Sequence, residues 1–168
     1  MARFLLALLL IQAFFSFSCP YTSKQPVNPA TRDTISGKVV RIIDGDTFEL
    51  LTAAQVNERI RLHGIDCPER SQPFSRKAKD HLEALVAGKT VSIIRMDKDR
   101  YNRTIAMVYI GTTNVNESML RAGYAWHFRR YDQNPRWQEL ELEARTNRRG
   151  LWAEPSPMAP WDWRAKNR

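Results

Sequence analysis

Cysteine and histidine are scarce in this chain. Its 168 residues include only two cysteines, Cys19 and Cys67, which excludes a disulfide-rich scaffold. The three histidines, His63, His81 and His127, have no zinc-ligand spacing with one another or with the cysteines. The chain also lacks internal repeats and a Gly-rich phosphate loop of the Walker type. Any chemistry must therefore come from other side chains, and Cys67 is expected to be a small buried residue.

Long apolar runs are missing except at the N-terminus. Residues 4–15 are apolar apart from Gln12, and residues 16–18 place small side chains where a signal peptidase cuts. The run is shorter than the roughly 20 residues that a bilayer span needs. We therefore predict a signal peptide over 1–18 and an exported protein, secreted or periplasmic. A lipid anchor on Cys19, and with it membrane attachment, is the alternative, although the residue three positions earlier is Ser and not the usual Leu.

Negative charge is in deficit. The chain has 26 Lys and Arg against 18 Asp and Glu, which gives a formal net charge of +8 and a pI near 9.9. A basic surface attracts polyanions such as nucleic acid or anionic lipid. Charge alone leaves open a solvated basic surface with no set partner.

The hydrophobic pattern predicts one small domain over 36–154, between a polar linker at 19–35 and a Pro- and Trp-rich tail at 155–168 that packs back as an extended segment. Five strands are expected, at 39–43, 47–51, 57–65, 91–94 and 104–110. Helices are expected at 73–87, from the cap Asn114 to Arg121, and from Asn134-Pro135 to Arg149. This order of elements predicts the α+β class and a five-stranded OB-fold barrel with about three helices, a fold that commonly binds oligonucleotides.

Three polar segments interrupt these elements. Residues 44–47 indicate a hairpin turn, but the turn needs only Asp44 and Gly45 and does not explain the carboxylate of Asp46. Residues 99–103 indicate a tight turn at Asn102. Between them, Asp66 and Glu69 flank a proline, so their carboxylates could converge on a hard cation such as calcium or magnesium. Taken singly, each segment is equally explained as a turn, a polar loop or a basic hairpin tip.

Together the three segments fit the cleavage of a phosphodiester. Arg61 and Arg103 can bind a phosphate and stabilise its developing charge. A metal on Asp46 and Asp66 can act as a Lewis acid, and Glu69 can accept a proton from the attacking water.

The segments IDGDTF, RLHGIDCPE and DRYNR, in this order, resemble the staphylococcal (micrococcal) nuclease family over about residues 36–152. The resemblance implies an OB-fold enzyme that uses Ca²⁺ to hydrolyse DNA and RNA to products with 3′-phosphate ends. Its catalytic residues match Arg61, Glu69 and Arg103. Its calcium ligands match Asp46, Asp66 and the backbone carbonyl of Cys67.

The same resemblance implies substrate contacts from Arg100 and Tyr101. Of a second aromatic pair, one member matches Tyr131 while the other falls on Arg129. Asn102 replaces a family glycine, and the loop after Glu69 is short. DNA and RNA are the implied partners, with no stable protein partner and a monomer as the default.

Two other functions compete with the nuclease. One is an inactive OB module that only binds nucleic acid, but such a module has no use for Glu69 beside an anionic substrate. The other is a membrane-attached structural or plasmid-maintenance factor, which only the leader and Cys19 support.

Overall fold

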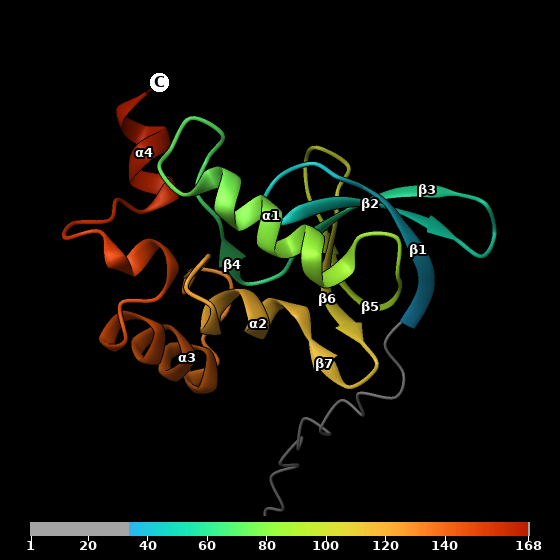
Figure 1. The fold of residues 1–168 in the computed structure, drawn as a ribbon. Helices are drawn as coiled ribbons and strands as arrows, with labels where there is room; N and C mark the ends of the chain where they lie inside the picture. The colour runs from blue at the N-terminus through green and yellow to red at the C-terminus, as the bar shows by residue number, and fades with distance from the viewer. Residues whose placement is uncertain (1–33, 168) are drawn as a thin grey trace, which may run out of the picture. The chain divides into compact units, whose positions relative to one another are not determined.

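The computed structural model describes residues 34–167, so the predicted signal peptide and Cys19 lie outside the described residues. Five strands form a closed barrel: β1 (Thr34–Ile42), β2 (Thr47–Thr52), β3 (Asn57–Leu62), β5 (Thr90–Lys98) and β6 (Thr104–Ile110). Their order is β3-β2-β1-β5-β6 with antiparallel neighbours, and a parallel pairing of β3 with β6 closes the sheet. The predicted five-stranded OB-fold barrel of the α+β class is confirmed (Figure 1).

Helices and short strands surround this barrel. The helices of the described chain are α1 (Ser75–Val86), α2 (Val115–Arg121), α3 (Pro135–Thr146) and α4 (Pro160–Lys166), with the 3₁₀ helix η2 (Gly150–Ala153). The short strands are β4 (Ile65–Asp66), β7 (Thr113–Asn114) and β8 (Trp126–His127), of which β7 extends the main sheet beside β6. Strand β4 pairs with β8 and so joins the segment after β3 to the segment after α2.

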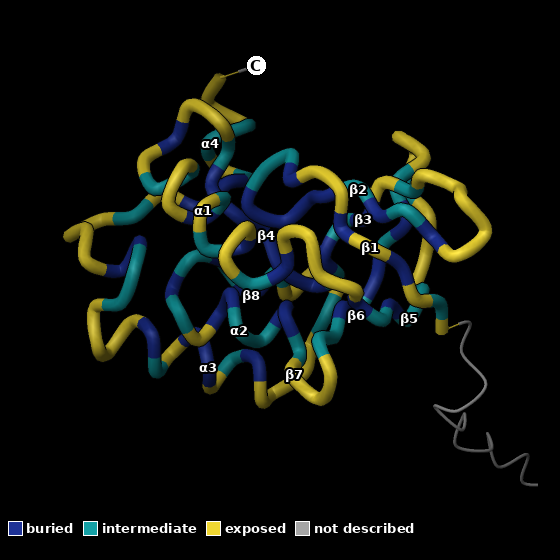
Figure 2. Tube along the Cα trace, turned by 45° about the vertical axis from the view of Figure 1, so that its right-hand side comes forward, coloured by how far each residue is buried: buried dark blue, intermediate teal, exposed yellow. Residues whose placement is uncertain are grey.

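The core lies between the barrel and α1. The inward-facing residues of the strands are fully buried, among them Phe48, Leu50 and Ile60. Helix α1 contributes its apolar face through Ala78, Leu82 and Val86, spaced four residues apart as the 3.6-residue period requires. Figure 2 shows these buried stretches as dark blue segments along the barrel strands.

Local signals in the sequence explain most element boundaries. The side chain of Asn114 accepts a hydrogen bond from the Glu117 amide and caps α2, and Asn134 caps α3 through the Arg136 amide. Asn102 has φ 63°, the left-handed conformation expected of it.

Two expectations for the C-terminal part were wrong. Helix α3 ends at Thr146 and not at Arg149, because Arg148 adopts a left-handed φ of 53°. The tail is not wholly extended, since Pro160–Lys166 forms α4, with the proline in the first turn where its missing amide proton costs nothing. Figure 1 shows α4 beside the loop that joins β4 to α1. Among residues 34–167 no helix is long and apolar enough to cross a membrane.

Candidate active site

Arg61 lies between two buried carboxylates. Its Nη1 donates to Asp46 Oδ1, and its Nη2 donates to Asp66 Oδ1 at 2.7 Å. The β2–β3 register places Thr47 opposite Arg61, so Asp46 stands one residue before the start of β2 and next to the guanidinium. Asp66 is the last residue of β4. The barrel thus brings three predicted site residues into one ion-pair cluster.

The two carboxylates have different electrostatic environments. Burial alone would raise the pKa of Asp46, but the Arg61 guanidinium and the Cys67 amide, which donates to Asp46 Oδ2 at 2.9 Å, offset this and lower its pKa. For Asp66, burial has the larger effect and raises the pKa, against the opposing influence of Arg164 and Arg61. The surroundings of Asp46 therefore favour its charged form. Burial disfavours the charged form of Asp66, and its cationic neighbours favour it.

A third carboxylate, Asp44, adjoins the pair. Its Oδ1 accepts from the Asp46 amide at 3.1 Å, and burial together with the charge of Asp46 raises the pKa of Asp44 to about 7. The sequence assigned Asp44 to the turn alone. Its partial burial beside Asp46, which only the packed structure supplies, makes it part of the charged cluster.

Gly45 and Cys67 fix the shape of the turn. A Cβ on Gly45 would lie 2.9 Å from the Cβ atoms of both Cys67 and Ala78, so the glycine is required by close packing and not by a positive φ. The Cys67 thiol donates to the Gly45 carbonyl at 3.2 Å, and burial raises the pKa of that thiol. The side chain of Cys67 is therefore a packing residue, as expected, and its predicted contribution to a metal is limited to its backbone carbonyl.

Glu69 lies at the edge of the same cluster and is bound by a residue that the sequence did not point to. Arg164, on α4, donates from Nη1 to Glu69 Oε1 at 2.5 Å and from Nη2 to Asp66 Oδ2 at 2.8 Å. Gln72 supports this arrangement, because its Oε1 accepts from the Glu69 amide and its Nε2 donates to the Met158 carbonyl ahead of α4. No sequence signal could have found Arg164, which stands 95 residues after Glu69 in a tail expected to be extended.

Arg103 belongs to a separate group at the β5–β6 turn. Asp99 accepts from the Arg103 amide at 2.9 Å and from its Nε at 2.7 Å, and these bonds, against the effect of burial, lower the pKa of Asp99. The guanidinium groups of Arg100 and Arg103 lie 4.8 and 5.6 Å from the Tyr101 ring centroid. Within residues 34–167 no hydrogen bond or ion pair joins Arg103 to the carboxylates beside Arg61.

The barrel closure nevertheless places Arg103 on the face that carries Arg61. In the parallel β3–β6 pair, Ile105 lies opposite Arg61. Arg103 precedes Ile105 by two residues, which is about 6–7 Å along a strand, and side chains two apart point to the same side. Arg61 and Arg103 therefore both project from the outside of the barrel.

Arg129 and Tyr131 lie on the loop that follows β8. Tyr131 is 62% exposed and contacts Phe128 edge-on, with ring centroids 4.8 Å apart. Arg129 reaches the nearly buried Glu141 of α3, with Nη2 3.7 Å from its Oε2. The β4–β8 pairing puts Trp126 opposite Asp66, so this loop begins close to the carboxylate cluster although no contact between Arg129 or Tyr131 and that cluster is found in the described chain.

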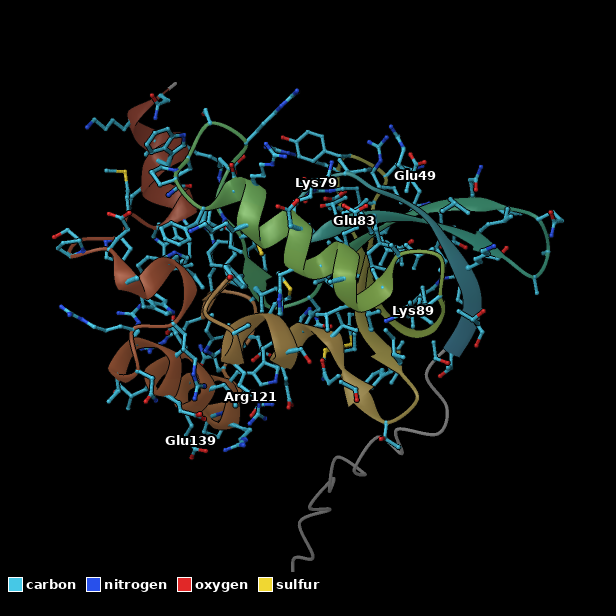
Figure 3. The ribbon with its side chains drawn as sticks, viewed as in Figure 1. Glu49, Lys79, Glu83, Lys89, Arg121 and Glu139 are labelled. Atoms are coloured by element: carbon cyan, nitrogen blue, oxygen red, sulfur yellow. The ribbon has the colours of Figure 1, made fainter. Side chains whose placement is uncertain are left out.

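A cleft of about 460 Å³ opens beside Asp46 and Arg61. Its volume is within the range of about 300–1,000 Å³ that small-ligand pockets occupy. Asp44, Asp46, Arg61 and Glu69 line it on one side. Four cationic residues complete the rim: Arg41, Arg70, Arg76 and Lys79. Figure 3 shows Lys79 on α1. The cleft thus combines one buried carboxylate, Asp46, and two half-buried ones with several cationic side chains.

The residues present suit a hard divalent cation. Within residues 34–167 no three His, Cys, Asp or Glu side chains already have the arrangement of a metal site. However, Asp46 and Asp66 are 2% and 1% exposed, and buried carboxylates need cationic compensation, which Arg61 and Arg164 supply here. Carboxylate and carbonyl oxygens are the donors that calcium takes. The donor chemistry of Asp46, Asp66 and the Cys67 carbonyl therefore fits that ion.

Comparison with known proteins identifies the family of the chain. The family described as "Staphylococcal nuclease homologue" matches residues 59–154. An uncharacterised endonuclease of Escherichia coli is 44% identical over 131 residues, which cover 77% of this chain and 85% of that protein. A micrococcal nuclease of Shigella flexneri is 39% identical over 147 residues, with 81% and 83% covered.

A third relative, an uncharacterised endonuclease of Haemophilus influenzae, is 37% identical over 142 residues, which cover 84% of this chain and 80% of that protein. The matches include the segment that holds Arg61, Asp66 and Glu69, and the fold is the barrel expected for these proteins. The chain belongs to the staphylococcal nuclease family.

Proposed function

We propose that this protein is an exported, calcium-dependent endonuclease that hydrolyses DNA and RNA and leaves 3′-phosphate ends. The observation that carries the proposal is the position of Arg61 between Asp46 and Asp66, with Glu69 on the rim of the same cleft. One guanidinium, two buried carboxylates and a more exposed carboxylate supply the charge stabilisation, the cation ligands and the base that phosphodiester hydrolysis requires.

Each residue has a distinct role in the proposed reaction. Asp46, Asp66 and the Cys67 carbonyl would hold the calcium, which supplies Lewis-acid polarisation of a phosphate oxygen when bound. Arg61 donates to the phosphate that undergoes attack and stabilises its added negative charge. Arg103, on the same outer face, turns from Asp99 toward a second oxygen of that phosphate.

Glu69 accepts the proton of the attacking water. The water oxygen then forms a bond to phosphorus, and the bond between phosphorus and the 5′-oxygen breaks. The leaving oxygen takes a proton from solvent, so that one product ends in a 3′-phosphate and the other in a 5′-hydroxyl. Glu69 is well placed for this role because its side chain is 38% exposed and can meet water at the cleft.

The cationic rim supports nucleic acid as the substrate. Arg70, Arg76 and Lys79 line the cleft. Arg76 has a long ion pair with Asp80 at 3.9 Å, and the other two form no ion pair within the described residues. Phosphates next to the scissile one would bind there through charge without regard to base sequence. The exposed rings of Tyr101 and Tyr131 are suited to stacking on bases. Arg100 lies beside the first ring and Arg130 beside the second, and Arg129 on the same loop would add a further cation.

The rival function, a binding module without activity, would not place Glu69 beside an anionic ligand, because a carboxylate there repels phosphate.

Export is proposed from the leader at residues 1–18, with a lipid anchor on Cys19 as the alternative. The protein is proposed to act as a monomer without stable protein partners.

The test uses the purified chain after removal of the leader. End-labelled single-stranded DNA and RNA are incubated with calcium, or with a chelator, at alkaline pH. We expect cleavage of both polymers only with calcium, and products that a polymerase extends only after phosphatase treatment. Absence of calcium-dependent cleavage by the wild type would exclude the enzyme, and directly extendable products would exclude 3′-phosphate ends.

A further inference from the structure

Every carboxylate oxygen of Asp46 and Asp66 already accepts a hydrogen bond. Asp46 Oδ1 accepts from Arg61 and Oδ2 from the Cys67 amide. Asp66 Oδ1 accepts from Arg61 and Oδ2 from Arg164. Each carboxylate oxygen has two lone pairs, so a cation could bind beside these donors, but the positive charges of Arg61 and Arg164 oppose it. A cation that binds these carboxylates therefore competes with the guanidinium groups that now neutralise them.

The donors differ in how easily they can leave. The Cys67 amide belongs to the backbone of a buried segment, and Arg61 extends from a barrel strand with a side chain that is 16% exposed. Arg164 is 38% exposed and comes from α4, a seven-residue helix near the end of the chain. Contacts of a half-exposed guanidinium are the least costly to exchange for water. Arg164 is thus the donor that gives way.

We infer that Arg164 is a positioning residue that acts through Asp66 and Glu69, neutralising both in the cation-free protein and leaving them when a divalent cation binds. The inference rests on the calcium site of the proposed function. Since a single guanidinium joins the two carboxylates, its departure from Asp66 also frees Glu69. The cation-binding carboxylate and the base would then become available together, and cation binding would precede proton transfer.

The rest of α4 is held independently of Arg164. The Trp161 ring stacks on Phe128, with centroids 5.0 Å apart and planes 14° apart, and meets Trp126 edge-on at 5.7 Å. Pro160 is buried, and the Met158 carbonyl accepts from Gln72. The guanidinium can therefore move while the helix stays in place, and loss of Arg164 should not detach α4.

The experiment measures calcium affinity by isothermal titration calorimetry without nucleic acid. The proteins are the wild type, Arg164→Gln and Lys166→Gln. The last removes one positive charge from the same helix at an exposed position, where Lys166 forms no ion pair within the described residues. We expect Arg164→Gln to bind calcium about tenfold tighter, since charge-assisted hydrogen bonds no longer compete. Lys166→Gln should change affinity by less than about twofold, because screening weakens an exposed charge at a distance.

The direction of the change separates this role from a structural one. A residue that merely shapes the site would weaken calcium binding when removed, and unchanged or weaker binding by Arg164→Gln overturns the inference while the calcium site stands. Equal tightening by Lys166→Gln also overturns it, because the effect would then be one of net charge. Absence of calcium binding by both the wild type and Arg164→Gln refutes the calcium site itself, and the inference with it.

A second measurement needs no substitution. In the wild type, the side-chain Nε–H signal of Arg164 in a nitrogen-15 NMR spectrum should shift on saturation with calcium, while the indole signal of Trp161 stays nearly unchanged. An Arg164 signal that does not respond to bound calcium contradicts the inference even if Arg164→Gln fails to fold. Arg164→Lys, which keeps the charge, should bind calcium with an affinity between those of the wild type and Arg164→Gln.

Discussion

Arg61 and Asp46 meet because the β2–β3 register sets Thr47 opposite Arg61 and so brings the turn before β2 to the middle of the cluster. The contact is nearly buried, with side-chain exposures of 16% and 3%. A guanidinium in this position compensates two carboxylates at once, and we expect both the stability of the fold and the proposed catalysis to depend on it.

Arg61→Ala should destabilise the fold by about 3 kcal/mol, because it leaves Asp46 and Asp66 buried without their shared partner. Urea denaturation followed by tryptophan fluorescence measures this. Arg59→Ala is the matched control on the same strand, because Arg59 is half exposed and its ion pair with Glu49 is long at 3.9 Å. This substitution should lower the free energy of unfolding by less than about 0.5 kcal/mol. Equal free energies of unfolding for the two variants would show that the ion pairs of Arg61 contribute little to stability.

Glu69→Gln should lower turnover by about 10²- to 10⁴-fold, the usual contribution of a general base, while the melting temperature stays close to that of the wild type. The reason is that glutamine fills the same space but cannot take the water proton. The control is Glu83→Gln, an exposed residue on α1 (Figure 3), which should leave turnover unchanged. Near-normal cleavage by Glu69→Gln would remove the glutamate from the mechanism.

Asp99→Asn should lower stability at neutral pH by up to about 1 kcal/mol, as expected of an ion pair at the protein surface that water still reaches. Its hydrogen bonds with Arg103 lower the pKa of Asp99 in the folded protein. The stabilisation is therefore present above the unfolded pKa of about 3.9 and is lost as pH falls through the still lower folded pKa.

Thermal melting of the wild type and Asp99→Asn from pH 7 down to pH 2 checks this dependence. The difference in melting temperature should be constant near neutrality and should shrink below about pH 4. Asp97→Asn, in the preceding strand end, serves as the comparison. A difference that persists unchanged in acid would mean that the Asp99 charge is not its source.

Lys79→Gln should weaken the binding of single-stranded DNA and make it less sensitive to salt, because one phosphate contact is lost. The slope of log K against log salt should decrease in magnitude by about 0.7. Affinity is measured by fluorescence anisotropy with Glu69→Gln as the background, so that the DNA is not cleaved. The control is Arg121→Gln, an exposed cation at the end of α2 and outside the cleft (Figure 3). An equal loss of affinity in the control would indicate general attraction rather than a path along the cleft.

The features that depend on a few neighbouring residues could be predicted from the amino-acid sequence. Asn114 and Asn134 marked two helix starts, Asn102 marked the β5–β6 turn, and the alternation around Arg61 placed it on the outer face of its strand. These follow from capping, backbone sterics and apolar periodicity, which act over one or two turns of chain.

The packing of the folded chain established which charged groups meet. It joined Asp46, Arg61 and Asp66, brought the half-buried Asp44 beside them, and kept Arg103 with Asp99. It also folded the tail into a helix and brought Arg164 to Asp66, 98 residues away. Such contacts depend on how the closed barrel and its helices pack, and a carboxylate in a linear sequence carries no information about which distant cation will neutralise it when water is removed.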